Sequence, residues 1–210
     1  IPLPQARGTG LGKPLKLINH PVREDIPIAI ASLGPTSVEA TAEIADAWLP
    51  AFYTAEAAST VWGEALKKGA SKRDPQRKPL SIFAGGSVAI GDGFEHLRDL
   101  SRPGAALYIG GMGARSKNFY NDIFSKSGYA AEAKTIQDLY LAGEKRAAEE
   151  AIPEEYLANS SLIGPEGFVR ERLHALKDSG VTSLNINLMG QELGERVTQL
   201  EKLRNLVDSM

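Results

Sequence analysis

Short apolar runs alternate with helix-like stretches along most of this chain. The first run, residues 26–32 (IPIAIAS), is uninterrupted, as expected of a parallel strand that is buried on both faces. Gly34-Pro35 stops it, and the residues that follow have the apolar spacing of an amphipathic helix. Because strands that alternate with helices form parallel sheets with helical crossovers, this pattern predicts an α/β fold.

Three more strand-like segments are each followed by helical sequence: residues 47–52 (AWLPAF), 80–92 (LSIFAGGSVAIGD) and 182–188 (TSLNINL). Within the second of them, Gly85 and Gly86 indicate a bulge or a close approach of two backbone segments. Four βα units amount to half of a closed eight-stranded barrel. The pattern therefore leaves two interpretations open, a complete small α/β fold or a barrel whose first half is absent.

The 210 residues are enough for one well-buried domain. We expect four regions within it: a connecting loop rich in Pro and Gly (1–25), βα units (26–93), a helical insertion (94–163), and the last βα unit with a C-terminal helix (164–210). The insertion is too long to be an ordinary loop. The chain starts at Ile1, without a methionine and in a loop-like stretch, so we expect it to begin in the middle of a larger fold.

Composition argues against several classes of function. The formal net charge of -2 provides no field that would gather polyanions, so we do not expect nucleic acid as a partner. No apolar run approaches the roughly 18 residues of a membrane span, and the N-terminus lacks the layout of a signal peptide, so we expect a soluble, cytoplasmic protein. The chain has no cysteine, and its three histidines are far apart in sequence, so we expect no metal site.

Two segments are candidates for ligand contacts. The turn SLGPTS, residues 32–37, joins the first strand to a helix N-terminus, where free backbone N–H groups favour an anion. The segment ALYIGGMGARSKNFYN, residues 106–121, is either a loop that meets a ligand or a close crossing of two helices. The residues alone favour the plainer alternatives, an ordinary tight turn and a helix crossing.

Four stretches of the chain resemble a known family. They are HPVREDIPIAIASLGPTSVEATAEIADAWLP, ALYIGGMGARSKNFYND, GYAAEAKTIQDLYLAG and SLIGPEGFVRERLHALKDSGVTSLNI. They are similar to the luciferase-like monooxygenase superfamily, and most similar to its actinobacterial branch that depends on the deazaflavin coenzyme F420. The resemblance covers nearly the whole chain from about Gly8. It implies a (β/α)8 TIM barrel with a late helical insertion, of which this chain is the C-terminal half, about strands 5 to 8.

The resemblance also implies which residues contact ligands. The turn after the first strand would bind the phosphate arm of the cofactor, through Ser32, Leu33, Gly34 and Ser37. The glycine-rich segment would line the substrate side of the pocket, through Tyr108, Gly110, Gly111 and Met112. Arg115 would pair with an anionic group of the cofactor or the substrate. We expect the catalytic residues in the absent N-terminal half, so this fragment alone should be inactive.

The reaction implied by the resemblance is hydride transfer between C5 of coenzyme F420 and an unidentified small organic substrate. Because a deazaflavin reacts poorly with oxygen, a reductase or dehydrogenase is expected rather than an oxygenase. Two alternatives remain, an FMN-dependent monooxygenase on the same barrel and a non-catalytic relative. The expected partners are the missing half of the barrel and, at full length, further copies of the protein; a half-barrel assembled from two copies is a further alternative.

Overall fold

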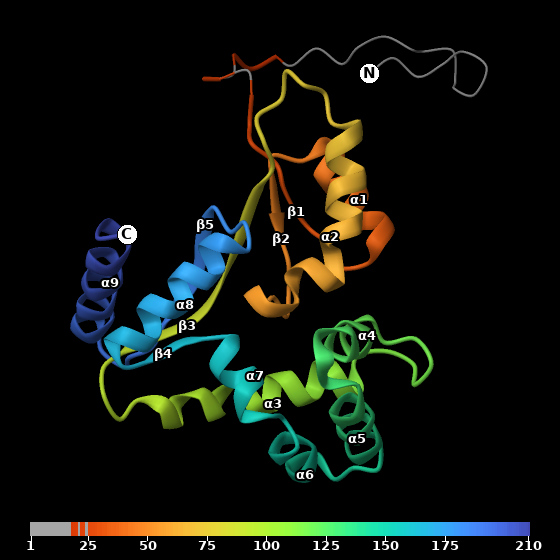
Figure 1. Cartoon of the computed structure of the whole chain (residues 1–210), viewed down its shortest axis with the longest axis vertical. Helices are drawn as coiled ribbons and strands as arrows, with labels where there is room; N and C mark the ends of the chain where they lie inside the picture. The colour runs from red at the N-terminus through yellow and green to blue at the C-terminus, as the bar shows by residue number, and fades with distance from the viewer. Residues whose placement is uncertain (1–17, 21, 24) are drawn as a thin grey trace.

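The computed structural model describes residues 18–20, 22, 23 and 25–210 (Figure 1). Most of the loop expected at 1–25 lies outside these residues. In the described part of the chain, one sheet contains five strands: β1 (Ala29–Ala31), β2 (Ala47–Leu49), β3 (Ser81–Ile90), β4 (Leu162–Gly164) and β5 (Ser183–Leu188). All their pairings are parallel, which confirms the predicted α/β fold. The sequence pattern missed β4, because its three residues stand between two helical stretches and, unlike β1, are not part of a longer apolar run.

Strand β3 is the centre of the sheet. It pairs with β2 at its start, with β5 along residues 83–88, and with β4 at its end. The last described helix, α9 (Leu193–Asp208), binds that end through the backbone N–H and the carbonyl of Ile90. Gln199 Oε1 accepts a hydrogen bond from the backbone N–H of Ile90 at 2.6 Å, and Lys202 Nζ donates to the carbonyl of Ile90 at 2.9 Å.

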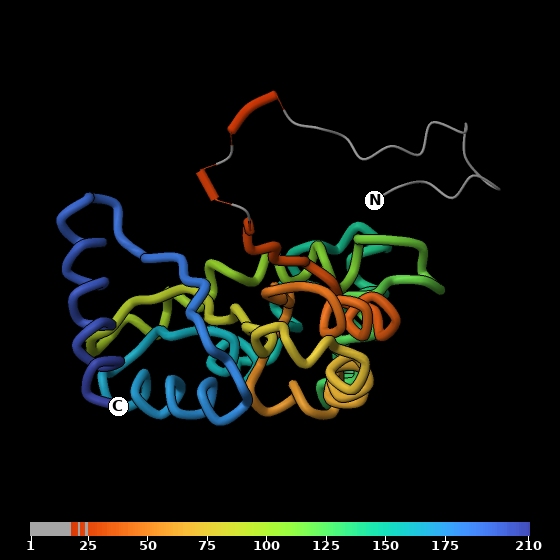
Figure 2. The backbone as a smooth tube through the Cα atoms, turned by 90° about the horizontal axis from the view of Figure 1, so that it is seen from above, coloured from red at the N-terminus to blue at the C-terminus, as the bar shows by residue number. Residues whose placement is uncertain are grey.

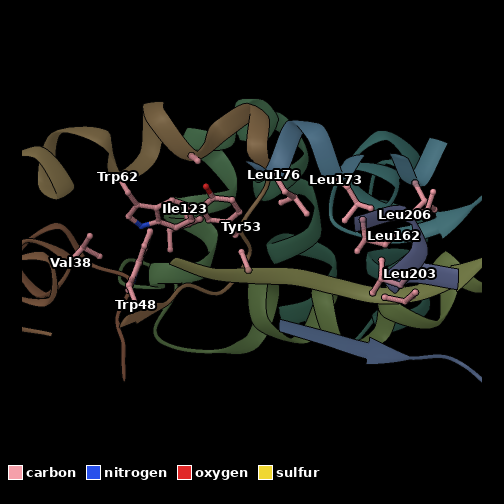
Figure 3. Close-up of a cluster of buried hydrophobic side chains, with 14 of the residues drawn as sticks. Val38, Trp48, Tyr53, Trp62, Ile123, Leu162, Leu173, Leu176, Leu203 and Leu206 are labelled. Atoms are coloured by element: carbon pink, nitrogen blue, oxygen red, sulfur yellow. The ribbon is translucent and has the colours of Figure 1, made fainter. Parts of the chain in front are cut away.

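Helices cover one face of the sheet: α1 (Pro35–Ile44), α2 (Ala55–Lys72), α8 (Glu166–Asp178) and α9. Figure 3 shows the hydrophobic core that their side chains form with the strands. In this core the rings of Trp48 and Trp62 meet edge to face, with centroids 5.3 Å apart, and Tyr53 stacks on Trp62. The two indole N–H groups donate to the carbonyls of Ser32 and Leu33, at 2.9 and 3.0 Å. The core therefore fixes the backbone where β1 ends.

The segment between β3 and β4 is helical. It contains η1 (Glu95–Ser101), α3 (Arg102–Ala106), η2 (Leu107–Gly111), α4 (Phe119–Phe124), η3 (Ser125–Tyr129), α5 (Ala130–Leu141), α6 (Lys145–Glu150) and α7 (Glu154–Asn159). Ile109, Phe124 and Ile136 are fully buried in a second hydrophobic core within this segment. Figure 1 shows α3, α4, α5 and α6 gathered in one block, and both Figures 1 and 2 show α9 on the other side of the molecule from α4. None of the helices in the described residues is long and apolar enough to cross a membrane.

An ion pair between a buried arginine and a half-exposed glutamate joins α8 to α2. Arg172 is 7% exposed, and both its Nη atoms donate to the carboxylate of Glu56. Its Nη2 also donates to the carbonyl of Asn159 at 2.8 Å, which ties in the end of α7. Burial opposes ionisation of Glu56, but the hydrogen bond from Arg172, a backbone hydrogen bond and the Arg172 charge outweigh it, so the pKa of this carboxyl is lowered.

Candidate functional site

A cavity of about 490 Å³ lies beside β3. Residues 83–87 of this strand line the cavity, and the side chains of Ala84, Val88 and Ile90 belong to the helical core. Because side chains alternate along a strand, the cavity is on the face of β3 that the core helices leave uncovered. The other walls come from the turn between β2 and α2, from β5, and from α3, η2, α4 and α7 of the insertion. The cavity therefore lies between the sheet and the insertion.

Four aromatic side chains form one wall of this cavity. The ring of Phe52 lies 6.0 Å from that of Tyr108, 5.5 Å from that of Tyr120 and 6.2 Å from that of Tyr156, measured between centroids. The rings of Tyr108 and Tyr120 are 4.7 Å apart and nearly edge to face. Phe52 follows β2, while the three tyrosines belong to the insertion. Aromatic packing therefore holds the insertion against the sheet at this wall.

Phe52 has an unusual backbone conformation. Its φ is 58°, and it is the only residue other than glycine with a positive φ in the described part of the chain. This left-handed conformation costs an aromatic residue about 1–2 kcal/mol. It persists because the ring packs against both hydrophobic cores. The strain therefore supports a ring position in the cavity wall.

The cavity wall is neutral near the aromatic cluster. Tyr156 is 6% exposed, and burial, with a smaller contribution from nearby Tyr129, raises the pKa of its phenol. Its phenol therefore stays protonated at physiological pH. Among the described residues, no acidic side chain or histidine lines this cavity, and no group of three such side chains could hold a metal ion. The wall can orient a ligand and exclude water, but it contains no acid–base pair.

Two glycines of β3 allow neighbouring backbone to come close. A Cβ at Gly85 would lie 2.5 Å from the carbonyl oxygen of Asn185 in β5. A Cβ at Gly86 would overlap the carbonyl of Ser160, where the insertion returns to the sheet. The close backbone approach expected from this glycine pair is confirmed. It leaves the side chain of Asn185 in the cavity wall.

The turn expected to bind phosphate lies at the carboxyl end of β1. Gly34 precedes α1 in an extended conformation, and no side chain caps the helix. The hydroxyl of Ser32 hydrogen-bonds that of Thr41, and the hydroxyl of Ser37 donates to the carbonyl of Gly34, both at 2.8 Å. The backbone N–H groups of Thr36 and Ser37, in the first turn, have no acceptor within the helix. The turn therefore offers an anion backbone donors rather than hydroxyl groups.

The structure separates the residues expected at the substrate pocket. Tyr108 lines the cavity. Gly110 and Gly111 pack against Tyr140 of α5, where a Cβ on either glycine would lie 2.5 Å from that side chain. Met112 is 43% exposed and is not part of the cavity wall. The glycine pair therefore makes the close helix crossing that the residues alone favoured.

Arg115 lies on the surface of the insertion. Its side chain is 62% exposed and forms an ion pair with Asp138 of α5. Nearby, the buried side chain of Asn118 donates to the carbonyls of Tyr108 and Ile109, both at 3.0 Å. Asn118 thus fixes the loop that follows η2.

The two candidate segments meet at one point. A Cβ at Gly34 would lie 3.7 Å from Cε1 of Phe119, the first residue of α4. The insertion therefore reaches the N-terminus of α1 as well as the aromatic cavity. Sequence reasoning missed Phe52, Tyr120, Tyr156 and Asn185 as cavity residues, because only the packing of distant segments brings them together.

Residues 5–183 match the family described as luciferase-like monooxygenase. The chain belongs to the luciferase-like monooxygenase family. The "Putative coenzyme F420-dependent oxidoreductase Rv3520c" of Mycobacterium tuberculosis is 36% identical to this family member over 186 residues, which are 88% of this chain and 53% of that protein. The resemblance noted in the sequence is thereby confirmed. The chain spans about half the length of the curated relative that it matches.

Two solved structures share the fold of this luciferase-like protein. One is the coenzyme F420 dependent tetrahydromethanopterin reductase from Methanopyrus kandleri, with a TM-score of 0.60 and 16% identity over 85% of this chain and 49% of that one. The other is an F420-dependent secondary alcohol dehydrogenase in complex with an F420-acetone adduct, with a TM-score of 0.58 and 10% identity over 88% of this chain and 49% of that one. At these identities the likeness shows the α/β fold with its parallel sheet.

Proposed function

We propose that the chain forms the C-terminal half of a (β/α)8 barrel in an oxidoreductase that uses coenzyme F420. Family membership and the M. tuberculosis relative support the class of enzyme. The sheet supports the half-barrel: in the described residues β1 pairs with β2 alone and β5 with β3 alone, so each has an edge free for strands of the other half. Those strands would supply more of the cavity wall, and we expect the chain alone to be inactive.

The observation that carries this proposal is the uncapped N-terminus of α1 at the carboxyl end of β1. Free backbone N–H groups and the helix dipole favour an anion there. An added Cβ at Gly34 would make only ordinary contacts with Phe119 and Ser37, so the backbone there is not tightly covered. We expect a phosphate group of the cofactor to accept hydrogen bonds from the backbone N–H groups of Thr36 and Ser37.

Coenzyme F420, when bound, supplies hydride transfer at C5 of its deazaflavin ring. The chain's contribution is to bind and orient. The aromatic wall of Phe52, Tyr108 and Tyr120 offers an apolar surface to flat molecules and keeps water out of the cavity. Because no acid–base pair lines the wall in the described residues, we expect the group that handles protons to come from the other half of the barrel.

Titration of the purified chain with coenzyme F420 and, separately, with FMN tests the proposal, since the two cofactors absorb visible light differently. We expect saturable binding of F420. Gly34→Asp should weaken it at least tenfold, because a carboxylate would face the phosphate, an effect of about 1.4 kcal/mol or more. Gly34→Ala is the control, because its Cβ makes only ordinary contacts and brings neither a charge nor an acceptor for the N–H groups of Thr36 and Ser37, so it should bind as the unchanged chain does.

Each other outcome has a clear meaning. Saturable binding of FMN alone would replace coenzyme F420 with a flavin. Equal affinity for F420 in Gly34→Asp and Gly34→Ala would show that the turn does not contact the phosphate. Binding of neither cofactor would favour a relative that retains the scaffold without the chemistry.

A further inference from the structure

A second, smaller cavity adjoins the aromatic one. Its volume is about 150 Å³, and Ser87, Ser101 and Ser160 line both cavities. The remaining wall of the smaller cavity includes Arg98 of η1 and Asn187 of β5. The two cavities therefore adjoin, and the smaller one has a mixed polar and apolar wall.

Arg98 is the only charged residue that lines either cavity in the described part of the chain. Its guanidinium is fixed from two sides. Nε and Nη2 donate to the carbonyl of Ile163, at 3.1 and 2.5 Å, and the group lies 4.6 Å from the ring centroid of Phe168. These contacts do not use Nη1, and a guanidinium carries five N–H donors in a rigid fork. Arg98 is thus held in place, while its Nη1 can still donate hydrogen bonds to a ligand.

A neighbouring arginine shows what a purely structural role involves here. Arg102 forms ion pairs with Asp99 and Glu154, and its Nη1 donates to the carbonyl of Ile152 at 2.6 Å. Arg98 differs, because no carboxylate of the described residues lies within ion-pair distance of it. A positive charge without a counterion, in a site whose other lining residues are neutral, favours an anionic ligand group.

The polar neighbours of Arg98 can complete such a site. Ser87 lies near the end of β3 and Asn187 near the end of β5, on the faces that line the cavities. Their hydroxyl and amide groups can donate alongside the guanidinium. One cation matches the single charge of a carboxylate better than the charge of nearly two that a phosphate monoester carries. The chemistry therefore points to a carboxylate.

We infer that the substrate carries a carboxylate, which Arg98 binds with Ser87 and Asn187, on an apolar or aromatic body that occupies the larger cavity. The inference rests on the proposed function, because it names the substrate class of that site. The carboxylate site is distinct from the expected phosphate site. Strands β1 and β3 are separated by β2, and neighbouring strands lie about 4.8 Å apart, which places the two sites about 10 Å apart or more.

The test is binding of 3-phenylpropionate and of 3-phenylpropanol to the purified chain, measured by calorimetry without any cofactor. The two probes share a body and differ in the carboxylate. A hydrogen bond to a charged group makes about a 10- to 100-fold difference, so we expect at least tenfold tighter binding of the acid. In Arg98→Met we expect the two probes to bind equally. Arg146→Gln, which removes an arginine that is 91% exposed on α6, should keep the preference.

Asn187→Leu is the second variant, because Asn187 is exposed and its replacement does not disturb the contact between Arg98 and Ile163. We expect it to reduce the preference several-fold, and it decides the test if Arg98→Met does not fold by circular dichroism. Equal binding of the two probes by the unchanged chain would overturn the inference, and so would a full preference in Arg98→Met or in Asn187→Leu. Failure of F420 binding with an intact, Arg98-dependent preference would overturn only the cofactor proposal.

Discussion

The ring of Phe52 lies nearly parallel to that of Tyr156, with an angle of 21° and centroids 6.2 Å apart. One residue follows β2, and the other belongs to α7, at the far end of the insertion. Their contact closes the cavity on one side and connects the two hydrophobic cores. The strained backbone of Phe52 is part of this arrangement.

Replacing Phe52 with alanine and with glycine separates ring packing from strain. Phe52→Ala should lower the free energy of unfolding by about 2 kcal/mol, less than the 3–5 of a fully buried phenylalanine, because Phe52 is half-buried. Phe52→Gly should lose about 1 kcal/mol less, because glycine tolerates a positive φ. Urea unfolding of both variants measures this. At positions with negative φ, a glycine variant is less stable than an alanine variant. If Phe52→Gly proves less stable than Phe52→Ala, the backbone at Phe52 is not strained.

The close packing of η2 on α5 predicts opposite effects for two Gly→Ala changes. Gly110→Ala should lower the free energy of unfolding by about 1–3 kcal/mol, because the new Cβ would clash with Tyr140. Gly104→Ala in α3 should raise it by about 0.5–1 kcal/mol, because no atom lies within 4 Å of the new Cβ and alanine favours the helix. Thermal or urea unfolding distinguishes them. Equal effects would mean that the crossing is looser than the structure shows.

Replacing Glu56 and replacing Arg172 should lower the free energy of unfolding by different amounts. Glu56→Gln leaves a buried guanidinium without its counterion and should lower the free energy of unfolding by about 2 kcal/mol, less than in fully buried pairs because solvent reaches Glu56. Arg172→Met leaves a half-exposed carboxylate and fills the space, so its effect should stay below about 1 kcal/mol. Chemical unfolding measures both, and a larger loss in Arg172→Met would contradict this reasoning.

The same pair predicts a dependence on pH. The pKa of Glu56 is lowered in the folded chain from its usual 4.5, so its stabilising effect is present above that pH and is lost as the pH falls through the folded value. The difference in unfolding free energy between the unchanged chain and Glu56→Gln should therefore shrink between about pH 5 and pH 3. Comparing the two cancels the effects of the other carboxylates. A difference that stays constant over this range would show that Glu56 is not ionised in the pair.

Local sequence patterns predicted most of the sheet. The runs at 26–32, 80–92 and 182–188 contain β1, β3 and β5, because a buried parallel strand is a continuous or alternating apolar segment whatever surrounds it. The glycine pair at 85 and 86 also indicated a close approach correctly, since few other roles favour two glycines in a strand.

The cavity could not be predicted in the same way. Phe52 and Tyr156 are about a hundred residues apart, and no local signal shows that their rings meet. The sequence did not predict a site role for Arg98, because the carbonyl that holds its guanidinium belongs to Ile163 of β4, the strand that the pattern missed. The family resemblance implied that four residues of the glycine-rich segment line the substrate pocket. Of these four, Tyr108 alone lines the cavity.

The hydrogen bonds between α9 and Ile90 affect the order in which parts of the chain fold during synthesis. The residues that bind the end of β3 follow it by 109 and 112 positions, so they leave the ribosome long after the strand does. Until residues 183–202 emerge, β3 has neither β5 beside it nor the side chains of α9 at its end. We expect contacts of such long range to form late in folding, and the ligand site to be complete only after α9 has left the ribosome.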